Sequence, residues 1–249
     1  MVARKVAEEG LYEYIDATAD VQRETSDLVL KAGVAGLKVL YSDGHFSMPV
    51  ILSILTSTGM HRGVHMSRLV AAASLARPRG IEAWLRSICR EVNRTQPGTE
   101  VTCSFEFPHD DQFAKVVVRT TEQGRATYQH TVSGMTACPC SKKMIGVGHM
   151  QRAEIALATK GRNHPDSSIV ISRIGECFSA LPKEKMKRLE EAKRIMEAQA
   201  NPRFAEDLVR ECVKRFPNAL FVSARCFESI HVHDAVATWT AKPGWMPLV

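Results

Sequence analysis

Two cysteines on either side of a proline are the part of this sequence best suited to chemistry. Cys138 and Cys140 flank Pro139, and His149 follows eleven residues after the first thiol. The proline fixes its own φ and holds the turn open, so both thiols can face one cavity to which His149 returns after a short loop. Zinc and ferrous iron accept such a mixture of sulfur, nitrogen and carboxylate oxygen. The stretch indicates a metal site or a reactive thiol, and a buried turn with inert thiols is the alternative.

Other polar clusters could share in that chemistry. Segment 62–68 holds two arginines, a histidine and a serine at a predicted strand-to-helix junction, where backbone N–H groups and cations bind phosphate. A solvated helix start is the alternative there. Two acidic pairs, Glu190-Glu191 and Glu206-Asp207, lie in predicted helices. Their alternative interpretation is a solvated carboxylate or one that complements the helix dipole.

Two histidines near the C-terminus form a further cluster of metal-binding groups. Alternation in the segment 228–233 places His231 and His233 on one face of a predicted strand, with Ser229 beside them. Two imidazoles on one strand face suit a metal ion or a proton relay, and a buried core pair is the alternative.

The hydrophobic pattern predicts the elements that must position these residues. Strands are predicted over 34–41, 46–56, 101–107, 114–120, 126–133, 153–159, 168–174, 219–229 and 233–240. Helices are predicted from 67 to a break at 77–80, from 81 to 92, and across 183–216 with an interruption at Asn201-Pro202. Each half of the chain is roughly two strands, helices and two strands, which is a weak structural repeat.

Composition narrows the class of protein. The 249 residues are 45% hydrophobic, which predicts a packed core in one large domain or two small ones. No apolar run reaches the ~18 residues of a membrane span, and the N-terminus lacks the apolar core of a signal peptide. Seven cysteines at irregular spacing favour a reducing compartment, so we expect a cytoplasmic protein that does not bind membranes.

The distribution of charge limits which kinds of binding partner we expect. The formal net charge is +6, but the basic residues are scattered and aromatic residues make up only 6%. A nucleic-acid-binding protein usually gathers Lys and Arg on one face, so we do not expect a nucleic-acid partner. A polyanionic small molecule would also explain a local excess of positive charge.

Five blocks taken together make the chain resemble the type IB GTP cyclohydrolases and the archaeal GTP cyclohydrolase of the same superfamily. The central block covers 133–142 and continues at 148–152, around the two thiols and the histidine. The other blocks are 20–22, 63–68, 201–207 and 227–233. They occur in the family order and span most of the chain, so their joint presence is far more specific than any one of them.

The resemblance implies an α+β tunnelling fold, with two tandem T-fold units per chain, antiparallel sheets and helices on one face. We accordingly divide the chain into an N-terminal half, 1–133, and a C-terminal half, 134–249, which carries most of the metal site. The resemblance also implies a homotetramer whose sites lie at subunit interfaces.

The implied reaction is hydrolysis of a cyclic amidine, the imidazole ring of GTP. Formate leaves and 7,8-dihydroneopterin triphosphate forms, as the first step of folate or pterin biosynthesis, with a divalent metal (Zn, Mn or Fe(II)) as cofactor. The implied metal ligands are Cys138, His149, Glu191 and His231. The implied catalytic residues are Cys140, Glu228 and His233. The substrate-binding residues are Glu206 for guanine and, for the triphosphate, Arg62, His65, Ser67, Arg68 and Arg152.

The choice of Glu191 rests on its spacing of fifteen residues before Glu206, and its neighbour Glu190 is the alternative. Ala137 and Met150 depart from the bacterial pattern, which leaves the archaeal product, 7,8-dihydroneopterin 2',3'-cyclic phosphate, as an alternative. Three other readings stay open: a non-catalytic pterin- or purine-binding T-fold protein, a different T-fold chemistry on another purine or pterin, and a basic RNA-binding module.

Overall fold

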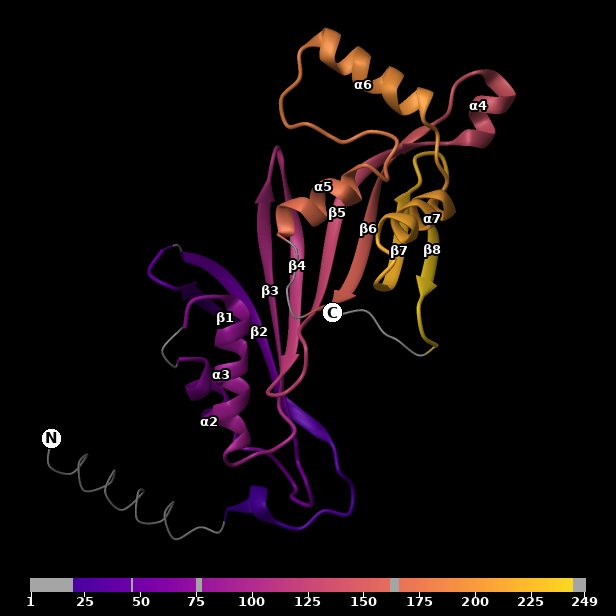
Figure 1. Ribbon diagram of the computed structural model, residues 1–249. Helices are drawn as coiled ribbons and strands as arrows, with labels where there is room; N and C mark the ends of the chain where they lie inside the picture. The colour runs from indigo at the N-terminus through magenta and orange to yellow at the C-terminus, as the bar shows by residue number, and fades with distance from the viewer. Residues whose placement is uncertain (1–19, 46, 75–77, 162–165, 244–249) are drawn as a thin grey trace, which may run out of the picture.

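A single antiparallel sheet of eight strands organises the molecule, and each strand pairs with its neighbours in the sequence. The computed structural model describes residues 20–45, 47–74, 78–161 and 166–243 (Figure 1). The strands are β1 (Lys31–Ser42), β2 (Ser47–Ser57), β3 (Glu100–His109), β4 (Gln112–Thr121), β5 (Thr127–Ala137), β6 (Met150–Lys160), β7 (Ala219–Phe227) and β8 (Ala235–Thr240). Because the order is sequential, the site residues of the C-terminal half lie on adjacent strands and their connections.

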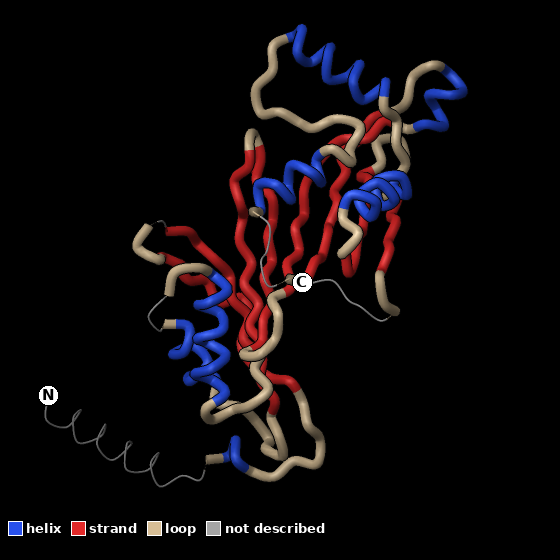
Figure 2. The backbone as a smooth tube through the Cα atoms, in the orientation of Figure 1, coloured by secondary structure: helices blue, strands red, loops and turns tan. Residues whose placement is uncertain are grey.

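The helices cover one face of the sheet. Among the described residues they are η1 (Val21–Arg23), α2 (Met66–Ala73), α3 (Ile81–Asn93), α4 (Pro139–Ile145), α5 (Ser167–Gly175), α6 (Arg188–Ala200) and α7 (Ala205–Arg215). Helices α2 and α3 pack on β1, β3 and β4, whereas α5 and α7 pack mainly on β5, β7 and β8. Helices α4 and α6 extend beyond one end of the sheet (Figure 2).

Strand alternation builds the core beneath the helices. Leu52 pairs with Cys103 and Cys103 with Val118, so the three side chains share one face, and all are buried. Trp84 and Ile88 of α3 lie one helical turn apart and complete this cluster. Burial of such a row of apolar side chains is the main force that holds α3 on the sheet.

A second cluster lies beneath α5 and α7 and joins the first. Ile155 of β6, Ile171 of α5 and Leu208 of α7 are among its fully buried members. Phe107 of β3 packs against both clusters. The core is therefore continuous along the sheet.

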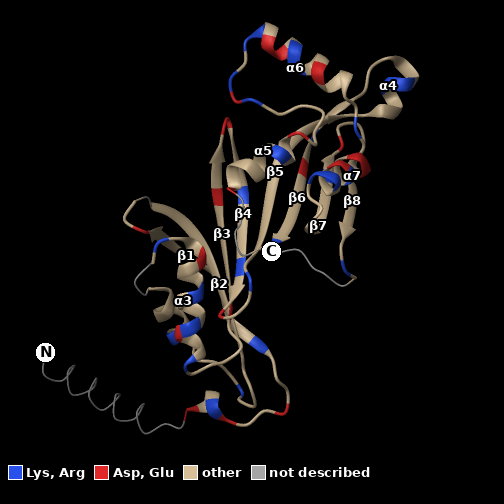
Figure 3. Ribbon diagram, in the orientation of Figure 1, with Lys and Arg blue, Asp and Glu red and all other residues tan. Residues whose placement is uncertain are grey.

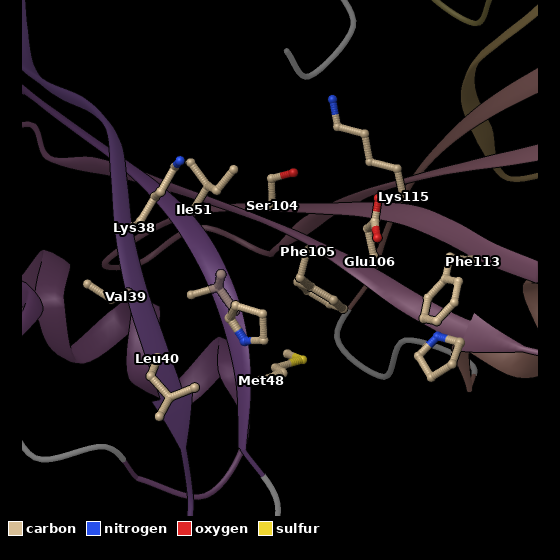
Figure 4. Close-up of a pocket in the computed structure, with 13 residues that line it drawn as sticks. Lys38, Val39, Leu40, Met48, Ile51, Ser104, Phe105, Glu106, Phe113 and Lys115 are labelled. Carbon is tan, nitrogen blue, oxygen red and sulfur yellow. The ribbon is translucent and has the colours of Figure 1, made fainter.

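The opposite face of the sheet, called the open face from here on, has apolar side chains over β1–β4, and no helix among the described residues covers it there. Leu40, Ile51 and Phe113 are exposed there, and a hollow of about 790 Å³ lies among them. Lys38 and Lys115 border the same hollow (Figure 4). A largely apolar open face of this kind suits contact with another surface.

The predicted elements agree with the structure except at the strand 168–174, at the strand predicted to carry His231 and His233, at the unpredicted helix α4 and at several boundaries. The predicted strand at 168–174 is wrong, because these residues form α5. The side chain of Asp166 accepts a hydrogen bond from the backbone N–H of Ser168 at 2.9 Å and caps the helix. Val170, Ile171 and Ile174 then recur at helical spacing and are buried, which favours the helix over an alternating strand.

The α+β class, the antiparallel sheet and the helices on one face agree with the prediction. The order of two strands, two helices and two strands occupies β1 to β4, and the C-terminal half adds α4 and a third packed helix to the same order. The predicted division after residue 133 falls inside β5 (Thr127–Ala137), and the division into two units stays a prediction. Within the described ranges, no helix is long and apolar enough to cross a membrane.

Candidate functional site

The Cys-Pro-Cys turn forms the start of α4. Cys138 is the residue before the helix, and Pro139 occupies the first turn, where a missing N–H costs nothing. The backbone N–H of Cys138 donates to the carbonyl of His149 at 2.9 Å, so the loop after α4 returns the histidine to the thiol. A Cβ at Gly148 would come within 2.5 Å of the Cys138 carbonyl oxygen. Only glycine therefore allows this return.

The carboxyl end of α6 holds the same loop in place. The amide of Gln199 accepts from the N–H of Gly148 at 2.9 Å and donates to its carbonyl at 2.8 Å. The ammonium of Lys142 donates to the backbone carbonyl of Gln199. The Ser141 hydroxyl accepts from the N–H of His149 at 3.1 Å. These contacts fix the position of His149 relative to Cys138.

A cavity of about 270 Å³ opens where this loop meets α7 and the β7–β8 connection. It gathers residues that lie far apart in the sequence. Its lining includes Cys138, His149, Gln151, Arg203, Glu206, Cys226, Glu228, His231 and His233. Three of the four predicted metal ligands, the predicted guanine-binding glutamate and two of the three predicted catalytic residues thus share one cavity.

His231 and His233 reach the cavity from a loop, not from the predicted strand. They lie between β7 and β8, whose ends are joined by an ion pair of 2.6 Å between Arg225 and Asp234. Their rings stack with centroids 5.3 Å apart and planes 15° apart. The ring of His149 meets that of His231 edge-on, with centroids 6.2 Å apart. The loop therefore brings its two imidazoles next to that of His149. The strand alternation from which we predicted their common face does not exist there.

Three oxygen atoms surround the Nδ1 atom of His149. The Oε1 atom of Gln151 lies at 2.9 Å, the hydroxyl of Ser229 at 3.4 Å and the Oε2 atom of Glu228 at 3.8 Å. The side chains of His149 and Glu228 are only 16% and 11% exposed. The Oε2 atom of Glu228 is buried and, within the described part of the chain, has no hydrogen-bond partner.

The first turn of α7 separates the roles of two neighbouring acids. Asp207 accepts a hydrogen bond from the backbone N–H of Phe204 at 3.0 Å and caps the helix. Glu206 takes no part in that cap and lines the cavity. Its carboxylate is exposed and available to a ligand.

The first turn of α6 has the same arrangement, but far from the cavity. Glu190 caps the helix by accepting from the backbone N–H of Lys187 at 2.8 Å. Glu191 is exposed and does not line the cavity. It precedes Gln199, which contacts the Cys138 loop, by eight residues, or ~12 Å along a helix. The structure thus does not bring Glu191 to the other predicted ligands, and its role stays a prediction.

The cavity has donor types that suit a divalent metal. Two thiols, three imidazoles and two carboxylates line it, and zinc or ferrous iron binds such mixtures. One carboxylate oxygen, on Glu228, is buried without a hydrogen-bond partner among the described residues. Within the ranges described, no three His, Cys, Asp or Glu side chains converge closely enough to hold an ion. Binding would therefore require the side chains, above all the exposed His231, to turn inward.

A second pocket, of about 480 Å³, lies beside the N-terminus of α2 and is called the α2 pocket here. Its cations are Arg23 and Arg68, and His61 and His65 also line it. Gln96, which is 7% exposed, accepts from the backbone N–H of His65 at 2.7 Å and fixes the turn into the helix. Helix N-termini and guanidinium groups both favour phosphate.

The predicted triphosphate-binding residues are divided among three places. His65 and Arg68 line the α2 pocket. Arg62 instead pairs with Glu24 at 2.6 Å, and Ser67 does not line the pocket. Arg152 borders a separate cavity of about 560 Å³. In Figure 1 the segment leading into α2 and the helices α4 and α6 lie at opposite ends of the molecule.

Comparison with known proteins decides the family. The family model described as "Type I GTP cyclohydrolase folE2" matches residues 50–237, which is most of the chain. The chain belongs to this family. It is therefore related to proteins named GTP cyclohydrolase, the activity that the sequence blocks imply.

Named relatives occur in both branches of the GTP cyclohydrolase family. The GTP cyclohydrolase MptA of Aeropyrum pernix is 31% identical over 217 residues, covering 71% of this chain and 76% of its own. That of Picrophilus torridus is 26% identical over 232 residues, covering 81% and 84%. The GTP cyclohydrolase FolE2 of Fervidobacterium nodosum is 28% identical over 202 residues, covering 73% and 77%.

Among solved structures, uricase from Arthrobacter globiformis aligns over 91% of this chain and 98% of its own, with 8% identity and a TM-score of 0.44. A hyper-thermostable mutant of a uricase gives a TM-score of 0.45 at 8% identity, over 87% and 93% of the two chains.

The structure adds cavity residues to which sequence reasoning gave no role. Gln151 and Arg203 stand inside blocks that resemble the GTP cyclohydrolases, so their positions in those motifs were the available signal. Cys226 is buried beneath the cavity, and burial raises the pKa of its thiol to about 11. Cys140, a predicted catalytic residue, lies on α4, is exposed and does not line the cavity.

Proposed function

We propose that this member of the GTP cyclohydrolase family is a metal-dependent enzyme that opens the imidazole ring of GTP, releases formate and forms 7,8-dihydroneopterin triphosphate. The observation that carries the proposal is the single cavity in which Cys138, His149 and His231 lie beside Glu206. A metal-binding donor set next to a free carboxylate is what hydrolysis of a bound guanine ring requires.

Recognition of guanine is assigned to Glu206. A carboxylate can accept two parallel hydrogen bonds, from the guanine N1–H and from its exocyclic amine. Because Asp207 provides the helix cap, Glu206 is free for this task. Adenine lacks a donor at N1 and would leave the carboxylate unpaired, so the same contact discriminates between the purines.

Cys138, His149 and His231 are the residues that would hold the metal, with a carboxylate as the fourth ligand. Such a metal, when bound, lowers the pKa of water so that hydroxide is available near neutral pH to add at C8. The chain's own part is to orient these donors and to keep the site small, through the hydrogen bonds of Gln199 and Ser141 to the loop.

Proton transfer is assigned to the remaining polar groups of the cavity. His233 stacks on His231 and can give a proton to the purine nitrogen as C8 becomes tetrahedral. Glu228 lies beside His149 and can exchange protons as the formyl group leaves. The later rearrangement and ring closure need mainly positioning and such acid–base groups.

Assembly would join the two pockets. We propose a homotetramer built from two T-fold units per chain, in which the α2 pocket of one copy supplies phosphate contacts to the Cys138 cavity of another. The open face over β1–β4 and the separation of the two pockets in one chain support this arrangement. Arg68 has no described ion-pair partner, so its charge is free for phosphate.

One experiment tests the product together with the activity. Purified protein is incubated with GTP after loading, in turn, with zinc, manganese and anaerobic ferrous iron. Formate is measured enzymatically and the pterin is identified by mass. Formate with the triphosphate supports the proposal, whereas a 2',3'-cyclic phosphate assigns the archaeal-type product. GTP binding with neither formate nor pterin, under all three metals, would mean a non-catalytic purine-binding protein.

A further inference from the structure

We infer that Gln151 is a positioning residue that fixes the tautomer of His149, so that the ring carries its proton on Nδ1 and leaves Nε2 free for a metal ion. This inference rests on the proposed metal site. It concerns a side chain to which the sequence blocks gave no role.

The first step is the short contact between the two side chains. The Oε1 atom of Gln151 lies 2.9 Å from the Nδ1 atom of His149, within ordinary hydrogen-bond distance. Gln151 is 8% exposed, so water cannot easily replace this contact. An amide oxygen only accepts, and the bond therefore requires a proton on Nδ1.

The second step is the charge on the same side of the ring. The Oε2 atom of Glu228 lies 3.8 Å from Nδ1, is buried, and lacks a hydrogen-bond partner among the described residues. A carboxylate oxygen also requires a donor. If the Gln151 amide were turned so that its NH2 group faced Nδ1, the lone pair of Nδ1 would face this carboxylate. The arrangement with a proton on Nδ1 gives the Gln151 oxygen its donor and turns an N–H, not a lone pair, towards the carboxylate, and it is favoured for that reason.

The third step concerns the other nitrogen. Within the described residues, Nε2 of His149 has no hydrogen-bond partner, and the ring lines the cavity with Cys138 and His231. A metal binds the unprotonated nitrogen of a neutral imidazole, and a partner on the other nitrogen fixes which one that is. Gln151 would do for His149 what a carboxylate or carbonyl does at many metal-bound histidines.

The tautomer can be measured without metal or GTP. Metal-free protein labelled with [15N]histidine is studied at pH 8 by long-range 1H–15N correlation, and His149 is assigned from the signals lost in His149→Ala. We expect the pattern of a proton on Nδ1 in the wild type. Gln151→Leu should move His149 towards a mixture of tautomers, and Gln151→Glu, which keeps an acceptor, should restore the Nδ1 proton. Gln129→Leu, which changes another buried glutamine of the sheet, should leave His149 unaltered.

Zinc affinity gives a second readout. In competition with a chelator, Gln151→Leu should bind zinc roughly 10- to 100-fold more weakly, whereas Gln151→Glu and Gln129→Leu should stay close to the wild type. A proton on Nε2 in the wild type, or an unchanged tautomer in Gln151→Leu, would overturn the inference. Absence of formate production would count against the proposed reaction but would leave the tautomer result standing.

Discussion

The two ends of the sheet carry pockets of opposite chemical character. The Cys138 cavity holds two thiols, imidazoles and two carboxylates around about 270 Å³, whereas the α2 pocket holds two arginines, imidazoles and amides around about 480 Å³. No Asp or Glu is among the described residues that line the α2 pocket. Similar runs of strands and helices in the two halves therefore place one site suited to metal and guanine and another suited to phosphate.

The difference between the two pockets indicates that the two halves of the chain have different binding tasks. A nucleoside triphosphate has one end that needs hydrogen-bond acceptors and another that needs cations, and the two pockets match those ends. Basic and acidic residues are mixed on α3 and α6 (Figure 3), so net charge alone does not mark either pocket. Because the pockets lie at opposite ends of one chain, the comparison predicts that function requires two chains.

The largest expected effect is the loss of bound metal when a donor of the Cys138 cavity is removed. Cys138→Ala and His231→Ala each remove a donor and should abolish both tightly bound metal and formate release. Cys140→Ala should keep its metal, because this thiol lies outside the cavity. Metal analysis of the purified variants and a formate assay provide the measurement. Full metal content in both ligand variants would contradict the assignment of the cavity.

Mixing inactive variants tests whether one site uses both pockets. Cys138→Ala removes the metal donor, and Arg68→Glu places a negative charge in the α2 pocket. Random assembly of equal amounts would create intact sites between unlike chains, with about a quarter of the wild-type activity. The two proteins are mixed, exchanged under mild denaturant and assayed. No recovery, in a mixture shown by native mass spectrometry to contain both chains, would place the whole site within one chain.

The α2 pocket alone should affect substrate binding more than chemistry. Arg68→Ala removes a charge-assisted contact worth ~1.5–3 kcal/mol, so KM for GTP should rise roughly 10- to 100-fold while metal content stays unchanged. Arg90→Ala, which changes an exposed arginine on α3, is the matched control and should be silent. An equal KM for both variants would remove Arg68 from the phosphate site.

The position of a site residue can be predicted from the sequence where its near neighbours in the chain fix it. It cannot be predicted where contacts with distant segments fix it. The Cys138–His149 return is predictable because proline, glycine and a short loop act locally. The pairing of His231 and His233 was predicted on a strand, but the ion pair between Arg225 and Asp234 closes a loop there instead. The strand predicted at 168–174 failed because β-branched residues also fit a buried helix face. Gln151 lies only two residues after His149, but its contact with that ring, like the place of Arg203 in the cavity, depends on side-chain orientations that spacing alone does not give.

The helical glutamates give a smaller effect and test the weakest part of the predicted ligand set. Glu190 already caps α6, so Glu190→Gln, which keeps an acceptor, should change metal affinity little. Glu191→Gln should lower it more than tenfold if assembly or metal binding brings α6 over the cavity. Chelator competition on both variants measures this. If both are silent, the site uses Cys138, His149 and His231 with Glu228 or water, and Glu191 is only a solvated residue.

The smallest expected effect is on the pH dependence of stability, through one buried thiol in each core cluster. Burial raises the pKa of Cys103 to about 12 and that of Cys226 to about 11, from an ordinary value of 9.0. Above about pH 9 the unfolded chain therefore releases thiol protons that the folded chain retains, and the free energy of unfolding falls as pH rises towards these values. Below pH 9 both states keep the protons, so the stability is fully present there.

A Cys103→Ala variant isolates one such thiol, and the slope of Tm against pH is the quantity that decides. The variant should melt lower at every pH because it leaves a small cavity in the core. Above pH 9, however, its Tm should fall less steeply than that of the wild type. One thiol contributes at most ~1.4 kcal/mol per pH unit, and ~1 kcal/mol corresponds to about 2–4 °C in a chain of this size. Calorimetry between pH 7.5 and 10.5 measures both slopes, and parallel curves would show that Cys103 ionises in the folded protein as readily as in the unfolded chain.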